Sequence, residues 1–291
     1  MAKTTLWTGL DATLPTKFDD ADNWDNGIPE AGDTIIFKDN AKDLDASLDQ
    51  SALTGCTVKI YQSYTGKIGS SGSYFQIGAT TLEIGEDYSV STPSGSGRLN
   101  LDLGGEAATV TIHNSASSAT DTGKMPIRLL LNDAAAVLRV RRGRVALAME
   151  PSETSLVASI DQSWMDSQDS DSTLQIGAGV TMTTLTKTGG SCTMLCAATT
   201  ATNSGGDLTI VRAGTITTLN ANGGRVWPES TGTITTMNIN GASVDETRCL
   251  AARTVTTTKL NSGSLKTNPA IVTRTNKITS DAAVLYSAAA A

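Results

Sequence analysis

The residues of this chain that could carry out chemistry are few and far apart. The 291 residues include one histidine, His113, and four cysteines, of which only Cys192 and Cys196 lie close together. A structural zinc site needs four nitrogen or sulfur ligands, and a nucleophilic triad needs a histidine beside its nucleophile. We therefore expect no metal site and no triad. We interpret the cysteines as small apolar core residues and His113 as a residue at a strand end.

Acidic residues could form two further kinds of site. Four aspartates lie in one segment: Asp161, Asp166, Asp169 and Asp171. Carboxylates bind calcium, but the segment lacks the D-x-D-x-D-G order of a calcium loop, so we interpret it as a solvated loop. Glycoside-cleaving enzymes place two carboxylates together, whereas we expect Asp102 to point outward beside Asn100 as a single acid. No phosphate-binding loop, dinucleotide fingerprint or nucleophile elbow is present. The sequence thus predicts no catalytic residue, no cofactor and no enzyme.

A basic run stands out in a chain whose formal net charge is −7. It holds Arg139, Arg141, Arg142 and Arg144, and strand alternation would place Arg139 and Arg141 opposite their apolar neighbours. We interpret these four arginines as an electrostatic docking surface for an acidic protein partner or a second copy. A solvated strand edge is the alternative. No aromatic residues alternate with the arginines and the protein is acidic, so we do not expect nucleic-acid binding.

The elements that position these residues are indicated by a repeat in the C-terminal third. A Thr-x-Thr-Thr phrase occurs four times, each followed by a turn of small residues: Thr181-Met-Thr-Thr-Leu185, Thr215-Ile-Thr-Thr-Leu219, Thr233-Ile-Thr-Thr-Met237 and Thr254-Val-Thr-Thr-Thr258. The gap between the first two copies is nearly twice as long as the later gaps, so it fits two equal steps. A period of roughly 20 residues is typical of a solenoid.

The composition of each copy favours strands over helices. β-branched residues fit a pleated surface, and alternation would place Ile216 and Thr218 on one face and Thr215, Thr217 and Leu219 on the other. We predict an all-β fold, a single-stranded right-handed parallel β-helix with an N-terminal cap. A low aromatic content of 4% suits the narrow interior of such coils. A threonine-rich β-sandwich or jelly roll is the alternative.

The first part of the chain, residues 1–50, differs from the rest and predicts the cap. It holds Trp7 and Trp24 with many acids, and an exposed solenoid end needs a cover against edge pairing. We assign residues 1–50 to the cap and opening rung, and residues 51–291 to the β-helix body, with a loop insertion near 150–172. We also assign Trp7 and Trp24, with the four arginines, to a partner-binding surface.

The opening phrase carries a resemblance. Its residues resemble the first rung of bacterial and viral right-handed β-helix proteins, among them autotransporter passengers: Trp7, Gly9, Asn23, Trp24, Gly27, Pro29, Gly32, Asp33 and Phe37. This opening, the Thr/Ser/Gly/Ala-rich composition and Phe75-Gln-Ile-Gly78 look like proteins of tailed phages that decorate or cement the capsid, or form spikes. The resemblance implies a virion protein that is assembled in the host cytoplasm. Its partner would be the major capsid protein or another virion protein, and it would form a homo-oligomer, a trimer.

The chain shows no secretory signal and no apolar run long enough to cross a membrane, so we expect synthesis in a cytosol and no membrane contact. Phage proteins meet this expectation, since lysis releases them. We therefore expect a structural capsid decoration or cement protein that stabilises the phage head. The alternative is a tailspike or receptor-binding protein that contacts host surface polysaccharide. A bacterial adhesin is a third possibility, which the missing signal disfavours.

Overall fold

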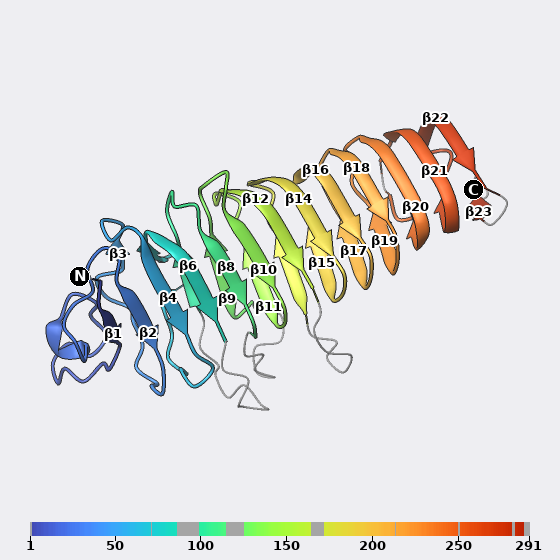
Figure 1. Ribbon diagram of the computed structural model, residues 1–291. Helices are drawn as coiled ribbons and strands as arrows, with labels where there is room; N and C mark the ends of the chain where they lie inside the picture. The colour runs from blue at the N-terminus through green and yellow to red at the C-terminus, as the bar shows by residue number, and fades with distance from the viewer. Residues whose placement is uncertain are drawn as a thin grey trace. The chain divides into compact units, whose positions relative to one another are not determined.

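The fold is a parallel β-helix, as predicted (Figure 1). The computed structural model describes residues 2–70, 72–85, 99–114, 125–163, 172–212, 214–249, 251–280 and 283–287. Apart from one turn of 3-10 helix, η1 (Ala21–Asn23), every element in these ranges is a strand. The chain divides into two compact units, Met1–Leu147 with Ser155–Val157, and Ala148–Thr154 with Ala158–Ala291.

Within the first unit, each coil contributes one strand to each of two parallel stacks. The first stack holds β1 (Thr4–Leu6), β2 (Thr34–Phe37), β4 (Cys56–Ile60), β6 (Ala79–Ile84), β8 (Thr109–Ile112) and β10 (Val137–Val140). The second holds β3 (Asp49–Gln50), β5 (Phe75–Ile77), β7 (Leu99–Asp102), β9 (Ile127–Leu130) and β11 (Arg144–Leu147). Inward residues in register form the core, as in one buried column: Ile35, Val58, Leu82, Val110 and Leu138.

The second unit repeats this arrangement. One stack holds β14 (Val180–Lys187), β16 (Ala197–Asn203), β18 (Ile216–Ala221), β20 (Ile234–Asp245), β21 (Arg253–Thr267) and β22 (Val272–Thr279). The other holds β13 (Thr173–Ile176), β15 (Ser191–Met194), β17 (Asp207–Ile210), β19 (Arg225–Pro228) and β23 (Ala283–Ser287). The long strands β20 and β21 pass through both stacks, so β23 pairs with the second half of β21.

The register confirms the predicted repeat. Ile216 pairs with Ile234, and Ile234 pairs with Val255, so the threonine phrases stack directly on one another. A copy that the sequence concealed, Ala197-Ala-Thr-Thr-Ala201, lies between the first two predicted copies. Its Ala198 pairs with Met182 on one side and with Ile216 on the other. The long first gap is therefore two coils of similar length, close to the two equal steps predicted.

The predicted alternation within each phrase is wrong. Ile216 and Leu219 are both buried, whereas the two threonines between them both face outward. Thr218 pairs with Thr236, but Thr217 lies outside the ladder of paired residues. A coil must bend between its two faces, and two successive outward residues let the strand bend while the apolar residues on both sides stay inside.

The predicted loop near 150–172 also needs correction. Residues Ser155–Gln162 form a strand, β12, in which Val157, Ile160 and Gln162 are buried. The segment lacks a run of β-branched residues, so its strand character comes from stacking in the coil more than from local propensity. The part of the predicted loop from 164 to 171 lies outside the described residues.

The last coils hold a buried cluster of charged residues. The carboxylate of Glu246, with a fully buried side chain, accepts hydrogen bonds from the guanidinium groups of Arg253 and Arg274. Arg253 also donates to the carbonyl oxygen of Pro228 at 2.9 Å. Buried charges are tolerated when they are paired and hydrogen-bonded, and this cluster holds the side chain of Arg274 toward the interior.

Candidate functional site

The predicted basic residues flank one turn of the first unit. Arg139 is exposed on β10, and its two strand neighbours are buried, as alternation predicts. Arg141 and Arg142 follow the strand, and Gly143 then leads into β11 with a φ of +94°, which suits glycine. Arg141, Arg142 and Arg144 are half-buried. The four arginines therefore lie at the end of β10, in the turn and at the start of β11, with Arg139 the most exposed. We call them the arginine turn.

The column of outward residues that contains Arg139 has a net positive charge. Arg139 lies in register with Thr111, and Thr111 lies in register with Glu83. The next residue in this column is Lys59, whose Nζ lies 2.8 Å from a carboxylate oxygen of Glu83. Lys59 and Glu83 neutralise each other, so the positive charge of this column is concentrated at Arg139.

The assignment of Trp7 and Trp24 to a partner-binding surface is wrong. Trp7 is fully buried and Trp24 is 5% exposed, and their rings pack edge to face with centroids 5.0 Å apart. Phe18 packs on Trp24 at the same distance, and Phe37 lies beside both tryptophans. The indole nitrogens donate to the carbonyl oxygens of Lys42 and Phe18. The tryptophans are therefore the core of the N-terminal cap, because closing the coil removes their large apolar surfaces from water.

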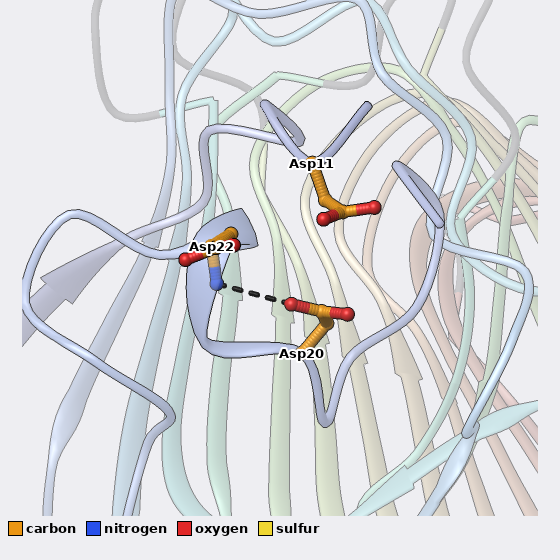
Figure 2. A group of neighbouring side chains, drawn as sticks. All are labelled: Asp11, Asp20 and Asp22. Atoms are coloured by element: carbon orange, nitrogen blue, oxygen red, sulfur yellow. Dashed lines mark hydrogen bonds between the residues drawn. The ribbon is translucent and has the colours of Figure 1, made fainter. Parts of the chain in front are cut away.

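The cap carries an acidic cluster that sequence reasoning missed. Asp11, Asp20 and Asp22 each present a carboxylate oxygen within 4.8 Å of the others (Figure 2). Asp11 accepts the backbone N–H of Thr13 at 2.7 Å and also that of Leu14, and Asp20 accepts the N–H of Asp22 at 3.1 Å. These bonds define the loop, so the three acids shape the cap, and their oxygen atoms are of the type that calcium binds. Asp11 is distant in sequence from the other two, so only the folded loop reveals the group.

The calcium candidate of the sequence is described only in part. Asp161 lies on β12 and is half-buried. Asp166, Asp169 and Asp171 lie outside the described residues.

A second missed surface is centred on Trp227 of β19. The Trp227 ring is half-buried, and the guanidinium carbons of Arg225 and Arg248 lie 5.0 and 5.9 Å from its centroid. Arg225 donates two hydrogen bonds of 2.8 Å to Asp207, and Arg248 forms an ion pair of 3.1 Å with Glu229. Both acids are thus paired with arginines, and the cations contact the ring.

A cavity of about 310 Å³ opens beside Asp102 in the first unit. Gln76, Asp102 and Glu106 contribute polar groups to its wall. Burial raises the pKa of Asp102, and its carboxylate accepts hydrogen bonds from the N–H of Gly104 at 3.0 Å and from Asn132 at 3.3 Å. The expectation that Asn100 and Asp102 share an outward face is wrong, because Asn100 is buried on β7. Two carboxyl groups therefore line one cavity, where the sequence indicated a single acid.

The reactive side chains of the interior are shielded. All four cysteines are buried, as predicted, and burial raises the pKa of Cys192 and of Cys196 to about 12. Their thiols stay protonated near neutral pH and are poor nucleophiles and metal ligands. Lys187 is fully buried and donates to the carbonyl oxygen of Gly205 at 2.6 Å. His113 directly follows the last residue of β8, as predicted.

Comparison of the chain with models of known protein families, with curated proteins and with solved structures finds no match. Over the residues that the structure describes, no helix has the length and apolar character needed to cross a membrane. The assignment of function therefore rests on the chemistry of the surfaces described above.

Proposed function

We propose that this chain is a structural virion protein, a capsid decoration or cement protein that stabilises a phage head. The main support is the in-register stacking of successive coils within each unit. Each strand of a stack is hydrogen-bonded to the next, and side chains reinforce this order. Asn238 donates to Asn220 at 2.9 Å, and Asn220 donates to Thr202 at 3.2 Å. A protein built this way suits a mechanical role, because contacts between neighbouring coils hold it together along its length.

The arginine turn is the proposed contact with the capsid. Arg139 is exposed, and four guanidinium groups at one turn favour an acidic partner surface. The proposed partner is the major capsid protein, and the proposed assembly state is a homotrimer within the virion. With the tryptophans buried in the cap, the arginine turn is what remains of the predicted docking surface.

The charged groups around Trp227 fit a binding role better than a catalytic one. Asp207 and Glu229 are each paired with an arginine. Both carboxylates are therefore already engaged by guanidinium groups beside an aromatic ring, an arrangement typical of a recognition surface.

The test is binding to empty phage capsids. We expect the purified protein to bind them at low salt and to dissociate as salt increases, because exposed charges are screened. Replacing Arg139 and Arg141 by alanine together should weaken this binding. The matched control replaces the exposed Lys38 and Lys277 by alanine, which removes the same charge elsewhere and should leave binding unchanged. Equal binding by both double variants at low salt would contradict the proposed contact.

One observation favours the alternative, a tailspike that contacts host surface polysaccharide. The cavity beside Asp102 is lined by two carboxyl groups and an amide, which are groups that bind sugar hydroxyls. Release of oligosaccharides from host surface polysaccharide, abolished by Asp102→Asn, together with failure to bind capsids, would establish this alternative over the decoration role.

A further inference from the structure

The last coil of the second unit is open on its inner side. On β21, Thr258 and Leu260 are fully buried, and they lie in register with Lys277 and Thr279 on β22. Both of these β22 residues are exposed, and so is every residue from 275 to 279. Within the described residues, the inward columns of the coil therefore end uncovered at β22. An uncovered end of a solenoid can pair with another chain unless something covers it.

A cavity of about 390 Å³ lies at this open coil. Apolar and cationic side chains make up most of its wall: Leu265, Pro269, Val272, Arg274 and Lys277. Ile278, on the same strand as Lys277, is 56% exposed. We call these five lining residues and Ile278 the end surface.

The end surface carries an excess of positive charge. In the buried cluster beneath it, the single carboxylate of Glu246 is bonded to two guanidinium groups, those of Arg253 and Arg274. Lys277 forms no ion pair with any residue that the structure describes. Cations beside apolar side chains fit a partner that offers carboxylates beside apolar side chains.

The N-terminal cap presents this complementary combination. Its loops carry two leucines and the three acids of Figure 2, which together we call the cap patch: Leu10, Asp11, Leu14, Asp20 and Asp22. Leu10 is 75% exposed and Leu14 is 46% exposed. None of the three acids forms an ion pair within the part of the chain that the structure describes.

A buried asparagine fixes the loops of the cap patch. The side chain of Asn23 accepts a hydrogen bond from the N–H of Asp11 at 3.0 Å and donates one to the carbonyl oxygen of Leu14 at 2.7 Å. Asn23 itself is fully buried. The cap patch is therefore held in place before any partner binds, which lowers the entropy that binding costs.

We propose that the end surface of one copy binds the cap patch of a second copy, so that the chains join head to tail. In this contact, Leu10 and Leu14 cover the apolar part of the cavity, and the aspartates face Lys277. A contact between two different surfaces gives each copy two neighbours, and it continues into a filament unless a ring closes.

A second copy is the favoured occupant because both halves of the contact are present on one chain. They match in charge and in apolar character, so no further protein is needed. Five large apolar side chains are exposed within the described residues, and three of them belong to these two surfaces: Leu10, Leu14 and Ile278. Exposed apolar residues are ordinarily scattered, so their concentration here favours an interface. This inference is independent of the proposed capsid role.

The test compares the self-association of three purified proteins by sedimentation velocity at several concentrations. The cap variant combines Leu10→Ser with Asp22→Lys, which leaves the loop bonds accepted by Asp11 and Asp20 in place. The end variant combines Lys277→Glu with Ile278→Ser. We expect the unmodified protein to associate at low salt and less at high salt, and each variant to associate roughly tenfold more weakly or not at all.

A mixture of the two variants is the decisive sample. The cap variant keeps the end surface and the end variant keeps the cap patch, so mixing them should restore association. The control variant, Lys38→Glu with Leu156→Ser, makes the same kinds of change at exposed positions outside both surfaces and should associate like the unmodified protein. Equal far-UV circular dichroism and thermal unfolding of all variants would establish that each is folded.

Four outcomes would overturn the proposal. Sedimentation of the unmodified protein that does not change with concentration would show that the two surfaces do not bind each other. Association of either variant to the same degree as the control would place the contact elsewhere. If both variants lose association and their mixture does not regain it, the contact does not join the cap patch to the end surface. If the unmodified protein does not associate and the end variant loses capsid binding, the end surface is a capsid contact.

Discussion

At the scale of single residues, the side chains that matter most point inward. Three buried polar side chains donate to backbone carbonyl oxygens at nearby turns. Gln162 donates to the carbonyl oxygens of Ser172 and Ser191. Lys187 donates to that of Gly205, and Asn203 donates to that of Gly223. A buried carbonyl oxygen without a donor is costly, so these side chains stabilise the turns from inside the coil. Lys187 is the exceptional member, because it carries a charge.

Lys187 predicts a pH dependence of stability. Burial lowers the pKa of Lys187 from 10.5 in the unfolded chain to about 8 in the folded protein. Between these values the unfolded state binds more protons than the folded state, so the free energy of unfolding should rise with pH from about 8 to 10.5. The expected gain is on the order of 2 kcal/mol.

The measurement is urea unfolding at pH 8 and pH 10 for the unmodified protein, Lys187→Met and the control Lys266→Met, whose side chain is 54% exposed. Other groups titrate in this range, but they are common to all three proteins. We expect the control to keep the pH-dependent gain and Lys187→Met to lose it. An equal gain in all three would show that Lys187 does not carry the effect.

At the scale of elements, the coils depend on glycine turns that approach one another closely. Gly224 has a φ of +67°, and a Cβ atom at this position would lie 2.2 Å from the carbonyl oxygen of Gly206. The turn before β19 therefore excludes any side chain for two reasons, its backbone conformation and its contact with the preceding coil.

A left-handed conformation costs an L-residue about 1–2 kcal/mol. We expect Gly224→Ala to lower the free energy of unfolding by more than this, because the new Cβ atom would also clash with the carbonyl oxygen of Gly206. The matched control is Gly105→Ala, since a Cβ at Gly105 meets no atom within 4 Å. We expect that control to leave the unfolding midpoint in urea nearly unchanged. Similar midpoints for the two variants would mean that the coils adjust at their turns, contrary to the packing described.

The elements also show what the sequence could predict. The repeated Thr-x-Thr-Thr phrase predicted the stacking of coils, because the same outward residues recur once in each coil. The coil at 197–201 was harder to find, because alanine replaces both Thr and the large apolar residues there. The bend at Thr217 and Thr218 could not be derived from local alternation, since it arises from closure of the coil. The strand β12 was missed for a similar reason, as stacking selects it.

The residues of a candidate surface could be predicted only where alternation along a strand determines which side chains face outward. Alternation correctly placed Arg139 outside, but it gave no information on Trp7, which loops carry into the centre of the cap. The acidic cluster of the cap requires Asp11 and Asp20 to meet across a loop, and the cavity beside Asp102 requires two segments to face each other. Contacts of this kind depend on the whole fold.

At the scale of the whole molecule, we expect that one complete coil can be deleted without preventing folding. Residues 216–233 form one complete turn of the second unit, since Ile216 pairs with Ile234 and Ala198 pairs with Ile216. Deleting this segment would let Ala198 pair with Ile234 and keep the apolar columns continuous. Stability in a repeat protein is nearly a sum of local terms, so we expect the shortened protein to fold, with a smaller dependence of its unfolding free energy on urea.

The control deletes residues 216–224, about half a coil, which would place outward residues of one strand over inward residues of another. We expect that protein to lose its cooperative unfolding transition. The comparison uses far-UV circular dichroism and urea unfolding of the three chains. Cooperative unfolding of the half-coil deletion, or collapse of the full-coil deletion, would show that the coils are not independent.

The aromatic cluster of the cap joins the first coil to segments that follow it in the sequence. Phe18 packs on Phe75, and Phe37 packs on Tyr64, with ring centroids 5.3 Å apart in both pairs. We therefore expect the cap to close only after Tyr64 and Phe75 have been made. Each later coil then has a formed strand edge to pair with, so we expect the coils to form in order along the chain.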